Sequence, residues 1–343
     1  MVATLPDTLR LIVVPVFCWA AVRDVRTRRL PNRIWPPLYA LGALVLCWEA
    51  VLLWPFAGLD GRLFLIRVAV SLFFVAPLAY AFWYLGAFGG ADAKALIALA
   101  VLFPTFPTYT AAGVSVPLVE TTLGVFSLTI LTNTVLLGLA YPIWLAVSNL
   151  AAGHRSMTMF LARPVSTASL SDRHGRLFET TAGVTRHGLD LDALRMYLRW
   201  RGLTLAELRD DPERLRDPDS VAETFRPTDG GTHVGPATDG GQPAQSPGRE
   251  AVGDGLTADG SADPPADGFD DPWAAAGFLE AVDHGAYGTD PETLRDGLEV
   301  VVYNDTVWVS PGMPFVVPMT AGLVVAVFYG DVLFAVLGLL GLV

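Results

Sequence analysis

The chain has 343 residues, of which 52% are hydrophobic and only 17% are charged, and its formal net charge at pH 7 is −11. With a mean hydropathy of +0.45, this composition excludes an ordinary soluble globular protein and predicts an integral membrane protein with several apolar spans of about 20 residues each. The two cysteines, Cys18 and Cys47, lie inside apolar runs and match no metal-ligand spacing, so we expect neither a disulfide framework nor a bound metal.

Apolar runs that could cross a bilayer occur near both ends of the chain. Five of them are evident, at residues 9–22, 35–54, 63–85, 123–147 and 315–343. A further run, residues 95–103, is shorter than a bilayer requires and is followed by Pro104 and Pro107, so it crosses only by extending to residue 118 or by tilting. Counting it as a span, we predict an all-α polytopic membrane protein with about six transmembrane helices.

Residues 151–312 form one long connection of different composition between the fifth and sixth spans. We predict a small α+β insertion here, with strands at 176–180 and 298–309, the latter turning at Asn304-Asp305, and a helix at 190–201. Within it, residues 217–271 are rich in Asp, Gly, Pro, Ser and Thr, so we expect a disordered acidic linker. The membrane domain is then residues 1–150, completed by a final transmembrane helix within 313–343.

Basic residues in the short loops predict the orientation of the spans. The second short loop, residues 55–62, contains only Arg62, whereas the first loop contains Arg23, Arg26, Arg28, Arg29 and Arg33. By the positive-inside rule, the first loop is cytoplasmic and the amino terminus lies outside the cell membrane. With six spans, the insertion and the glycine-rich turn at residues 86–94 also face the cytoplasm.

Lys94 is the only lysine of the chain, and the acidic excess lies mostly in the insertion. Abundant aspartate with scarce lysine is typical of salt-adapted organisms such as haloarchaea, although a high genomic GC content would also deplete lysine. We interpret the acidity as a means of solubility and not as steering of basic partners, because the Debye length falls to about 3 Å in 1 M salt. We predict no nucleic-acid partner.

Two aspartates are predicted to meet at the cytoplasmic face. Asp92 lies in the glycine-rich turn before the short apolar run, and Asp24 directly follows the first span. Paired carboxylates a few ångströms apart do not both ionise, so one acts as an acid while the other activates water, an arrangement that hydrolyses peptide bonds without a metal. Taken alone, Asp24 could be a solvated partner of neighbouring arginines and Asp92 a helix N-terminal cap. Their coincidence on one face favours catalysis.

Two motifs around these aspartates resemble those of the type IV prepilin peptidase family of GxGD-type aspartic proteases, and in particular its archaeal prepilin and prearchaellin (preflagellin) branch. Residues 89–94 resemble the Gly-x-small-Asp-x-Lys signature of the family, residues 24–32 resemble its Asp-x-Arg…Pro-Asn loop, and residues 307–331 resemble the end of the archaeal proteins. The resemblance implies that Asp24 and Asp92 are catalytic. It also implies a supporting role for the other motif positions, which are Gly89, Gly90, Ala91, Lys94, Arg26, Pro31 and Asn32.

The resemblance further implies a membrane aspartic endopeptidase that removes the short basic leader peptide from type IV prepilin-like and prearchaellin precursors at the cytoplasmic membrane face. Its partners would be these precursors and membrane lipid, and no cofactor is predicted. The bacterial relatives carry Cys pairs and also methylate the new amino terminus. No Cys-x-x-Cys and no glycine-rich cofactor loop occurs here, so methylation is not predicted. Ala91 stands where glycine is common, which reduces backbone freedom beside Asp92.

A non-enzymatic alternative is a transporter or ion-binding protein that uses Asp24 and Asp92 as proton or ion sites. Such transporters show paired halves with broken helices, and no internal repeat is visible in the sequence. Two other charged residues, Glu49 and Arg67, lie inside apolar runs, where we expect them to pair or to face the bundle interior. Lys94 opposes the dipole of its helix, so it either lowers the proton affinity of Asp92, holds a lipid phosphate or snorkels to the interface.

Overall fold

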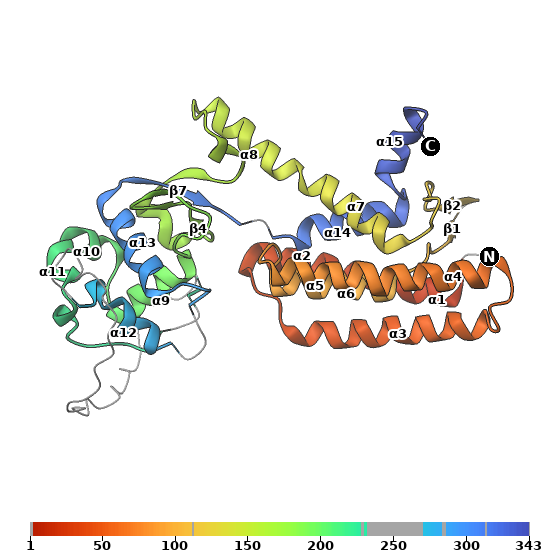
Figure 1. Ribbon diagram of the computed structural model, residues 1–343, viewed down its shortest axis with the longest axis horizontal. Helices are drawn as coiled ribbons and strands as arrows, with labels where there is room; N and C mark the ends of the chain where they lie inside the picture. The colour runs from red at the N-terminus through yellow and green to blue at the C-terminus, as the bar shows by residue number, and fades with distance from the viewer. Residues whose placement is uncertain are drawn as a thin grey trace, which may run out of the picture. The chain divides into compact units, whose positions relative to one another are not determined.

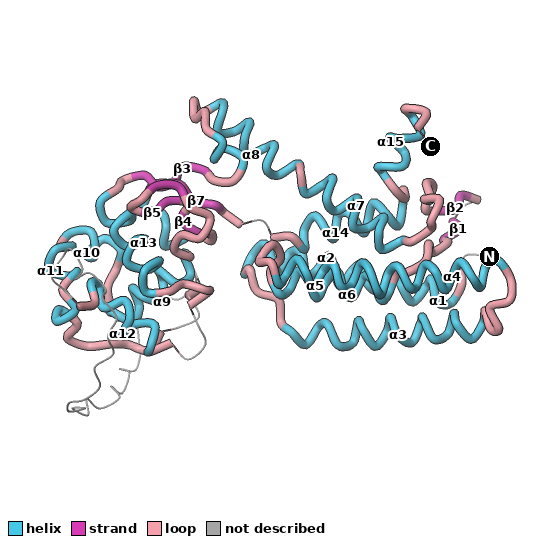
Figure 2. Tube along the Cα trace, viewed as in Figure 1, coloured by secondary structure: helices cyan, strands magenta, loops and turns pink. Residues whose placement is uncertain are grey.

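The computed structural model describes residues 3–111, 113–227, 230–231, 270–282, 286–312 and 314–342. The chain divides into two units, one built from Met1–Trp144 with Met313–Val343 and the other from Leu145–Gly312, and each has its own hydrophobic core. The first unit is mainly helical, and the second combines helices with short strands (Figure 2). This is the helical polytopic architecture with a small strand-containing region that the sequence predicts.

The first unit is a bundle of apolar helices (Figure 1). Within the described residues, four helical stretches are long and apolar enough to cross a membrane, so the protein is multi-pass. They comprise α1 (Leu5–Arg10) with α2 (Val13–Thr27), α3 (Trp35–Leu52), α4 (Leu59–Val70) with α5 (Ala76–Tyr84), and α7 (Phe126–Gly138) with α8 (Ala140–Ala151). A π-helical turn, Ser71–Val75, joins α4 to α5.

The helix at the centre of this bundle is α6 (Gly90–Leu102), which packs against α3, α5 and α14 (Val316–Phe328). Seven of its thirteen residues are buried, among them Leu96 and Leu99. A helix surrounded by other helices meets protein on every side, which explains why its sequence is apolar all round and shows no amphipathic stripe. The approach of α3 is closest at Gly42, because a Cβ there would lie 2.8 Å from Val101 Cγ1.

Residues 95–118 do not form one continuous helix. The sequence left open whether this run extends to residue 118 or tilts. The helix ends at Leu102 after 13 residues, or about 20 Å, which is shorter than the roughly 30 Å hydrocarbon core. The prolines that follow cannot continue it. The chain instead forms a loop and an antiparallel hairpin of β1 (Tyr109–Ala111) and β2 (Val114–Val116).

The last apolar run differs from the expected single helix, because it is divided into α14 and α15 (Val332–Leu339). Gly330 between them has a φ of +105°, and a Cβ at this position would lie 2.0 Å from the Val119 carbonyl oxygen, so only glycine fits. Asp331 then caps α15 by accepting a hydrogen bond from the Phe334 backbone N–H at 3.0 Å. A close approach of two backbones therefore interrupts the run.

The second unit is built on an antiparallel sheet in the order β3-β7-β4. The strands are β3 (Arg163–Ser166), β4 (Arg176–Leu177) and β7 (Thr306–Ser310), and a separate hairpin pairs β5 (Glu179–Thr180) with β6 (Gly183–Val184). The helices are α9 (Leu191–Arg201), α10 (Leu205–Asp210), α11 (Pro212–Arg216), α12 (Ala275–Glu280) and α13 (Pro291–Tyr303). Their apolar faces form a core that includes Tyr197 and Trp273, both fully buried.

The expected strand at residues 298–309 is wrong in its first half, because residues 298–303 belong to α13. Four of its buried side chains, at 294, 298, 301 and 302, are spaced for one face of a helix, and Val300 is buried as well. Asp290 caps this helix by accepting a hydrogen bond from the Thr293 backbone N–H at 2.7 Å, and Pro291 occupies its first position. The strand itself, β7, begins at Thr306.

Most of the expected linker, residues 217–271, lies outside the described residues. Its first part is described and packs on the second unit, where the Phe225 backbone N–H donates to the Trp200 carbonyl at 2.8 Å. The Phe225 ring also covers Gly202, whose left-handed conformation ends α9. The prediction of disorder therefore remains a prediction only for residues 228–229 and 232–269, which lie outside the described residues.

Candidate active site

Asp24 lies on the inner face of α2, one turn before the helix ends. The buried positions of α2 are spaced by four, three and four residues, so the carboxylate continues the apolar stripe that packs on α14. These positions are Val13, Phe17, Ala20 and Asp24, and Asp24 is only 8% exposed. The helix stops because Arg28 adopts a left-handed conformation, with φ +54°, while its N–H donates to the Asp24 carbonyl at 2.9 Å.

Asp92 lies in the first turn of α6, directly after the glycine-rich turn. The Gly89 backbone N–H donates to Asp92 Oδ2 at 3.0 Å, which orients the carboxylate at the start of the helix. A Cβ at position 89 would lie 3.0 Å from the same oxygen, so glycine leaves room for it. Gly86, with φ +72°, makes the turn itself. The carboxylate is thus held at the positive end of the helix dipole.

Three helix ends converge on this carboxylate. Asp92 interacts electrostatically with Asp24 at the end of α2 and with the Val316 backbone N–H at the start of α14. The positive charge of the Arg28 guanidinium attracts both carboxylates. Two acidic groups from distant parts of the chain therefore share one site beside a cation and the N-terminal ends of two helices.

The motif residues that follow Asp24 form a link to α6. Pro31 precedes a 3-10 turn that begins at Asn32, and the Asn32 Oδ1 atom accepts a hydrogen bond from Lys94 Nζ at 2.7 Å. The carbonyl of Lys94 accepts a second hydrogen bond, at 3.1 Å, from the Tyr39 hydroxyl of α3. Lys94 therefore has a protein partner in the first loop, which none of the roles suggested by the sequence included.

The remaining motif residues lie next to the two aspartates in sequence. Gly90 and Ala91 form the first turn of α6, and the Arg26 side chain is exposed on α2. Two further residues at the site, Tyr39 and Val316, were not predicted from the sequence. Tyr39 belongs to no motif, and Val316 contributes only its backbone N–H, which no side-chain pattern could reveal.

The chemistry available at this site is that of carboxylates. Among the residues that the structure describes, no group of three or more His, Cys, Asp and Glu side chains could hold a metal ion. The charges of Asp24 and Asp92 interact, and for one to act as acid and the other as base, both must also reach the same water molecule.

Two family models match the chain. One, described as the type IV leader peptidase family, matches residues 11–143, a range that contains both aspartates and their motifs. The other, described as the archaeal peptidase A24 C-terminus, type II, matches residues 289–332, which include α13, β7 and α14. No curated protein sequence matches the chain at a significant level.

Proposed function

The chain belongs to the type IV leader peptidase family and carries the archaeal form of its C-terminal region, and we propose that it is an aspartic endopeptidase that removes the short basic leader from prepilin-like and prearchaellin precursors. It is a multi-pass membrane peptidase, and its family implies a precursor protein as the substrate. The observation that carries the aspartic assignment is the interaction of Asp24 and Asp92, which come from separate helices.

In the proposed reaction, the two carboxylates share one proton, so that one of them is ionised. The ionised carboxylate takes a proton from water as the water oxygen bonds to the scissile carbonyl carbon, and the protonated carboxylate gives its proton to the carbonyl oxygen. When the tetrahedral intermediate collapses, the C–N bond breaks, the protonated carboxylate gives its proton to the leaving amine, and the ionised carboxylate takes a proton from a hydroxyl of the intermediate, which restores the shared proton. The cycle consumes one water molecule and involves no covalent enzyme intermediate.

The neighbours of the two aspartates supply the orientation that this reaction requires. The N–H group of Gly89 orients the Asp92 carboxylate, and the Asn32–Lys94 hydrogen bond holds the loop after α2 against α6. Positioned acid and base groups are effective because their geometry is set before the substrate binds. These contacts support the proposal without adding a further reacting group.

The place of the site within the bundle suits a leader that precedes a hydrophobic segment. Asp24 lies at the end of one apolar helix and Asp92 at the start of another, so a peptide bond at the edge of a substrate's membrane segment would reach both. The arginine-rich loop that follows Asp24 favours the cytoplasmic side for this edge. We therefore place cleavage at the cytoplasmic membrane face.

Co-expression with a prepilin-like precursor tests the proposed function. The expected result is a precursor that migrates faster, by the mass of its leader, when the wild-type chain is present and that is unchanged when Asp92→Asn is present at the same membrane level. N-terminal sequencing of the product locates the cut. A precursor that the wild-type chain leaves intact would contradict the proposal.

A further inference from the structure

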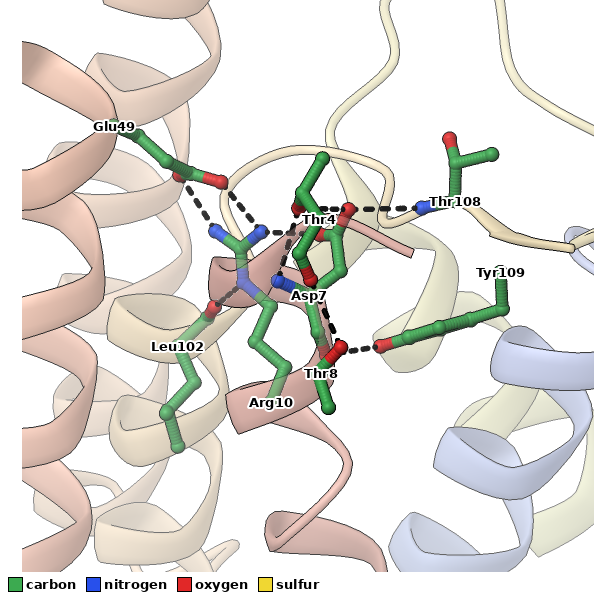
Figure 3. A network of polar contacts seen from close by, with 8 residues as sticks. All are labelled: Thr4, Asp7, Thr8, Arg10, Glu49, Leu102, Thr108 and Tyr109. Carbon is green, nitrogen blue, oxygen red and sulfur yellow. Dashed lines mark hydrogen bonds and ion pairs between the residues drawn. The ribbon is translucent and has the colours of Figure 1, made fainter. Parts of the chain in front are cut away.

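Arg10, at the end of α1, is a fully buried cation at the opposite end of α6 from Asp92. Its Nη1 and Nη2 atoms donate to the two carboxylate oxygens of Glu49 at 2.6 and 2.7 Å, and Nη1 also donates to Asp7 Oδ1 at 2.9 Å. Its Nε donates to the Leu102 carbonyl at 2.7 Å, so one guanidinium joins α1, α3 and the last residue of α6 (Figure 3).

The sequence left open whether Glu49 and Arg67 pair or face the bundle interior, and the structure shows that they do not pair with each other. Glu49 binds Arg10, whereas Arg67 Nε donates to the Leu123 carbonyl at 3.0 Å. A bidentate arginine–carboxylate pair is directional as well as strong, because two parallel hydrogen bonds fix the relative orientation of both planar groups. Arg10 is therefore held in one geometry.

A second layer of contacts holds Asp7 in place. Its Oδ2 atom accepts hydrogen bonds from the Thr4 hydroxyl at 2.7 Å and from the Thr108 backbone N–H at 3.4 Å. The Asp7 carbonyl accepts one from the Tyr109 hydroxyl at 3.1 Å (Figure 3). The loop after α6 is thus bound to the same network. The charged groups of this network have partners on several sides, as buried charges require.

The C-terminal end of α6 is anchored by groups from other elements. The last carbonyls of a helix have no partner within it. Here the Leu102 carbonyl binds Arg10, and the Ala100 carbonyl accepts a hydrogen bond from the Ser71 hydroxyl at 2.6 Å. A cation at this end also complements the helix dipole. Both anchors act on the final turn of the helix whose first turn carries Asp92.

We propose that Arg10 is a positioning residue of the peptidase, which fixes α6 so that Asp92 meets Asp24. The proposal rests on the proposed function, because its effect is exerted through the aspartate pair. The segment that carries Asp24 runs from α1 through α2 into the following loop, and it binds α6 at both ends. The Asn32–Lys94 hydrogen bond lies near the site, and the hydrogen bond from Arg10 to the Leu102 carbonyl lies at the far end. Contacts at both ends of one rigid helix determine its tilt as well as its position along its own axis.

The length of α6 makes the site sensitive to this distant contact. A helix of 13 residues is about 20 Å long, so a tilt of about 5° at one end displaces the other end by about 1.7 Å. A misplacement of about 1 Å can cost about 10²-fold in rate, because acid–base chemistry depends on preset geometry. Loosening the far anchor therefore slows the chemical step and leaves the surface that binds substrate intact.

Arg10→Lys is the discriminating variant. Lysine keeps a positive charge for Glu49 and Asp7, but it has a methylene group where arginine has Nε, so the Leu102 carbonyl loses its donor. We expect kcat for a purified prepilin-like substrate to fall at least tenfold, with KM within twofold of the wild-type value. A merely structural role would lower the amount of folded enzyme without changing kcat per folded molecule.

Ser71→Ala removes the other side-chain anchor described above for the C-terminal end of α6 without disturbing a buried charge. It decides the question if Arg10→Lys does not accumulate. We expect a loss of kcat of about threefold with an unchanged KM. The matched control is Asp331→Asn, in a separate buried network where Asp331 Oδ2 accepts a hydrogen bond from the Thr129 hydroxyl at 2.9 Å. This control should lower the melting temperature and leave kcat per folded molecule unchanged.

Three outcomes would overturn the positioning role. They are a kcat of folded Arg10→Lys within twofold of wild type, an equal loss of kcat in Asp331→Asn, and an unaffected Ser71→Ala where Arg10→Lys does not fold. The wild-type chain separates these from a failure of the proposed function. If it cleaves no precursor, the peptidase assignment fails, whereas a cleaving wild type with an unaffected Arg10→Lys contradicts the positioning role alone.

Discussion

Lys94 Nζ and Asn32 Oδ1 lie 2.7 Å apart, so the only lysine of the chain binds the loop that follows α2. The contact joins α6 near Asp92 to the segment that carries Asp24. A lysine near the start of a helix opposes the helix dipole, so its presence requires a compensating partner, and Asn32 is such a partner. The two motifs that resemble one family are therefore connected to each other physically.

The first prediction concerns the aspartate pair. Asp24→Asn and Asp92→Asn should each abolish precursor cleavage, because an amide can neither accept the proton of water nor return one. General acid–base catalysis contributes typically 10²–10⁴-fold per positioned group, so each single change should remove nearly all measurable turnover. The double variant should be about as inactive as either single one, because the two groups act as a unit. Processing assays at matched membrane levels provide the measurement.

Asp60→Asn is the control for this experiment. Asp60 is an exposed acid in the first turn of α4, and it should tolerate the change with cleavage intact. An Asp24→Asn protein that still cuts at more than a few per cent of the wild-type rate would remove Asp24 from the site and leave Asp92 without its partner.

The second prediction concerns the Lys94–Asn32 contact. Lys94→Met and Asn32→Ala should each lower the cleavage rate about fivefold, which corresponds to about 1 kcal/mol for an exposed hydrogen bond. In a double-mutant cycle, the double variant should lose no more than either single one, because both changes remove the same contact. Additive losses would mean that the two side chains act independently.

Parts of this site follow from local sequence, and parts do not. Asp24 and Asp92 could be placed on one face because each stands in a short motif beside an apolar run, and the structure brings them into electrostatic contact. Their catalytic roles stay predictions. The Arg10–Glu49 pair could not be predicted, because 39 residues separate its members and only packing selects the partner of a buried charge.

Residues 298–303 show a different limit of predicting structure from sequence. Val300, Val301 and Val302 are β-branched and follow Leu298, so the run has the composition of a strand while its spacing also fits a helix. The Asp290 cap and Pro291 after it favour the helix, and these two residues lie eight and seven residues before the start of the run. A reading confined to the apolar residues therefore misses them.

The third prediction concerns topology. Because arginines crowd the first loop, a reporter fused after Arg29 and another fused after Asp172 should both indicate the cytoplasm. Alkaline phosphatase and fluorescent-protein fusions measure this directly. Opposite answers at the two positions would show that an odd number of crossings separates them.

The fourth prediction concerns the expected linker. Gly230 belongs to that segment, yet its carbonyl accepts a hydrogen bond from Arg195 Nε at 2.6 Å, so a deletion should begin after Gly231. Removing residues 232–267 should leave membrane accumulation and cleavage within twofold of wild type, because each doubling of loop length changes the closure cost by only about 0.6 kcal/mol. Immunoblotting and the processing assay measure both quantities.

A deletion of equal length, residues 222–257, is the matched control. It removes Phe225, which covers Gly202 at the end of α9, so accumulation should fall. Loss of cleavage with normal accumulation in the 232–267 deletion would instead identify a functional segment there.

The fifth prediction concerns pH. The hydrogen bond from the Thr293 backbone N–H lowers the pKa of Asp290 below its ordinary value. Because the folded-state pKa is the lower one, the stabilisation is present above the unfolded pKa of about 3.9 and is lost as the pH falls through the folded value. Asp290→Ala should lower the free energy of unfolding by about 1 kcal/mol near neutral pH.

Hydrogen exchange of α13 peptides, measured on the full chain in detergent, checks this prediction. The difference between Asp290→Ala and wild type should persist down to about pH 4 and shrink below it. Asp290→Asn is the control, because asparagine caps about as well as aspartate and does not titrate. A difference that is independent of pH down to pH 2 would show that the carboxylate is not the stabilising group.

The enclosure of α6 has a consequence for the surrounding lipid. Helices that touch acyl chains respond to bilayer thickness by tilting, but more than half of the residues of α6 are buried and both ends of the helix bind neighbouring elements. Lipid length can act on it only indirectly, through neighbours that are themselves bound to its two ends. A change in membrane composition should therefore alter the inclination of the outer helices before it alters the separation of the two carboxylates.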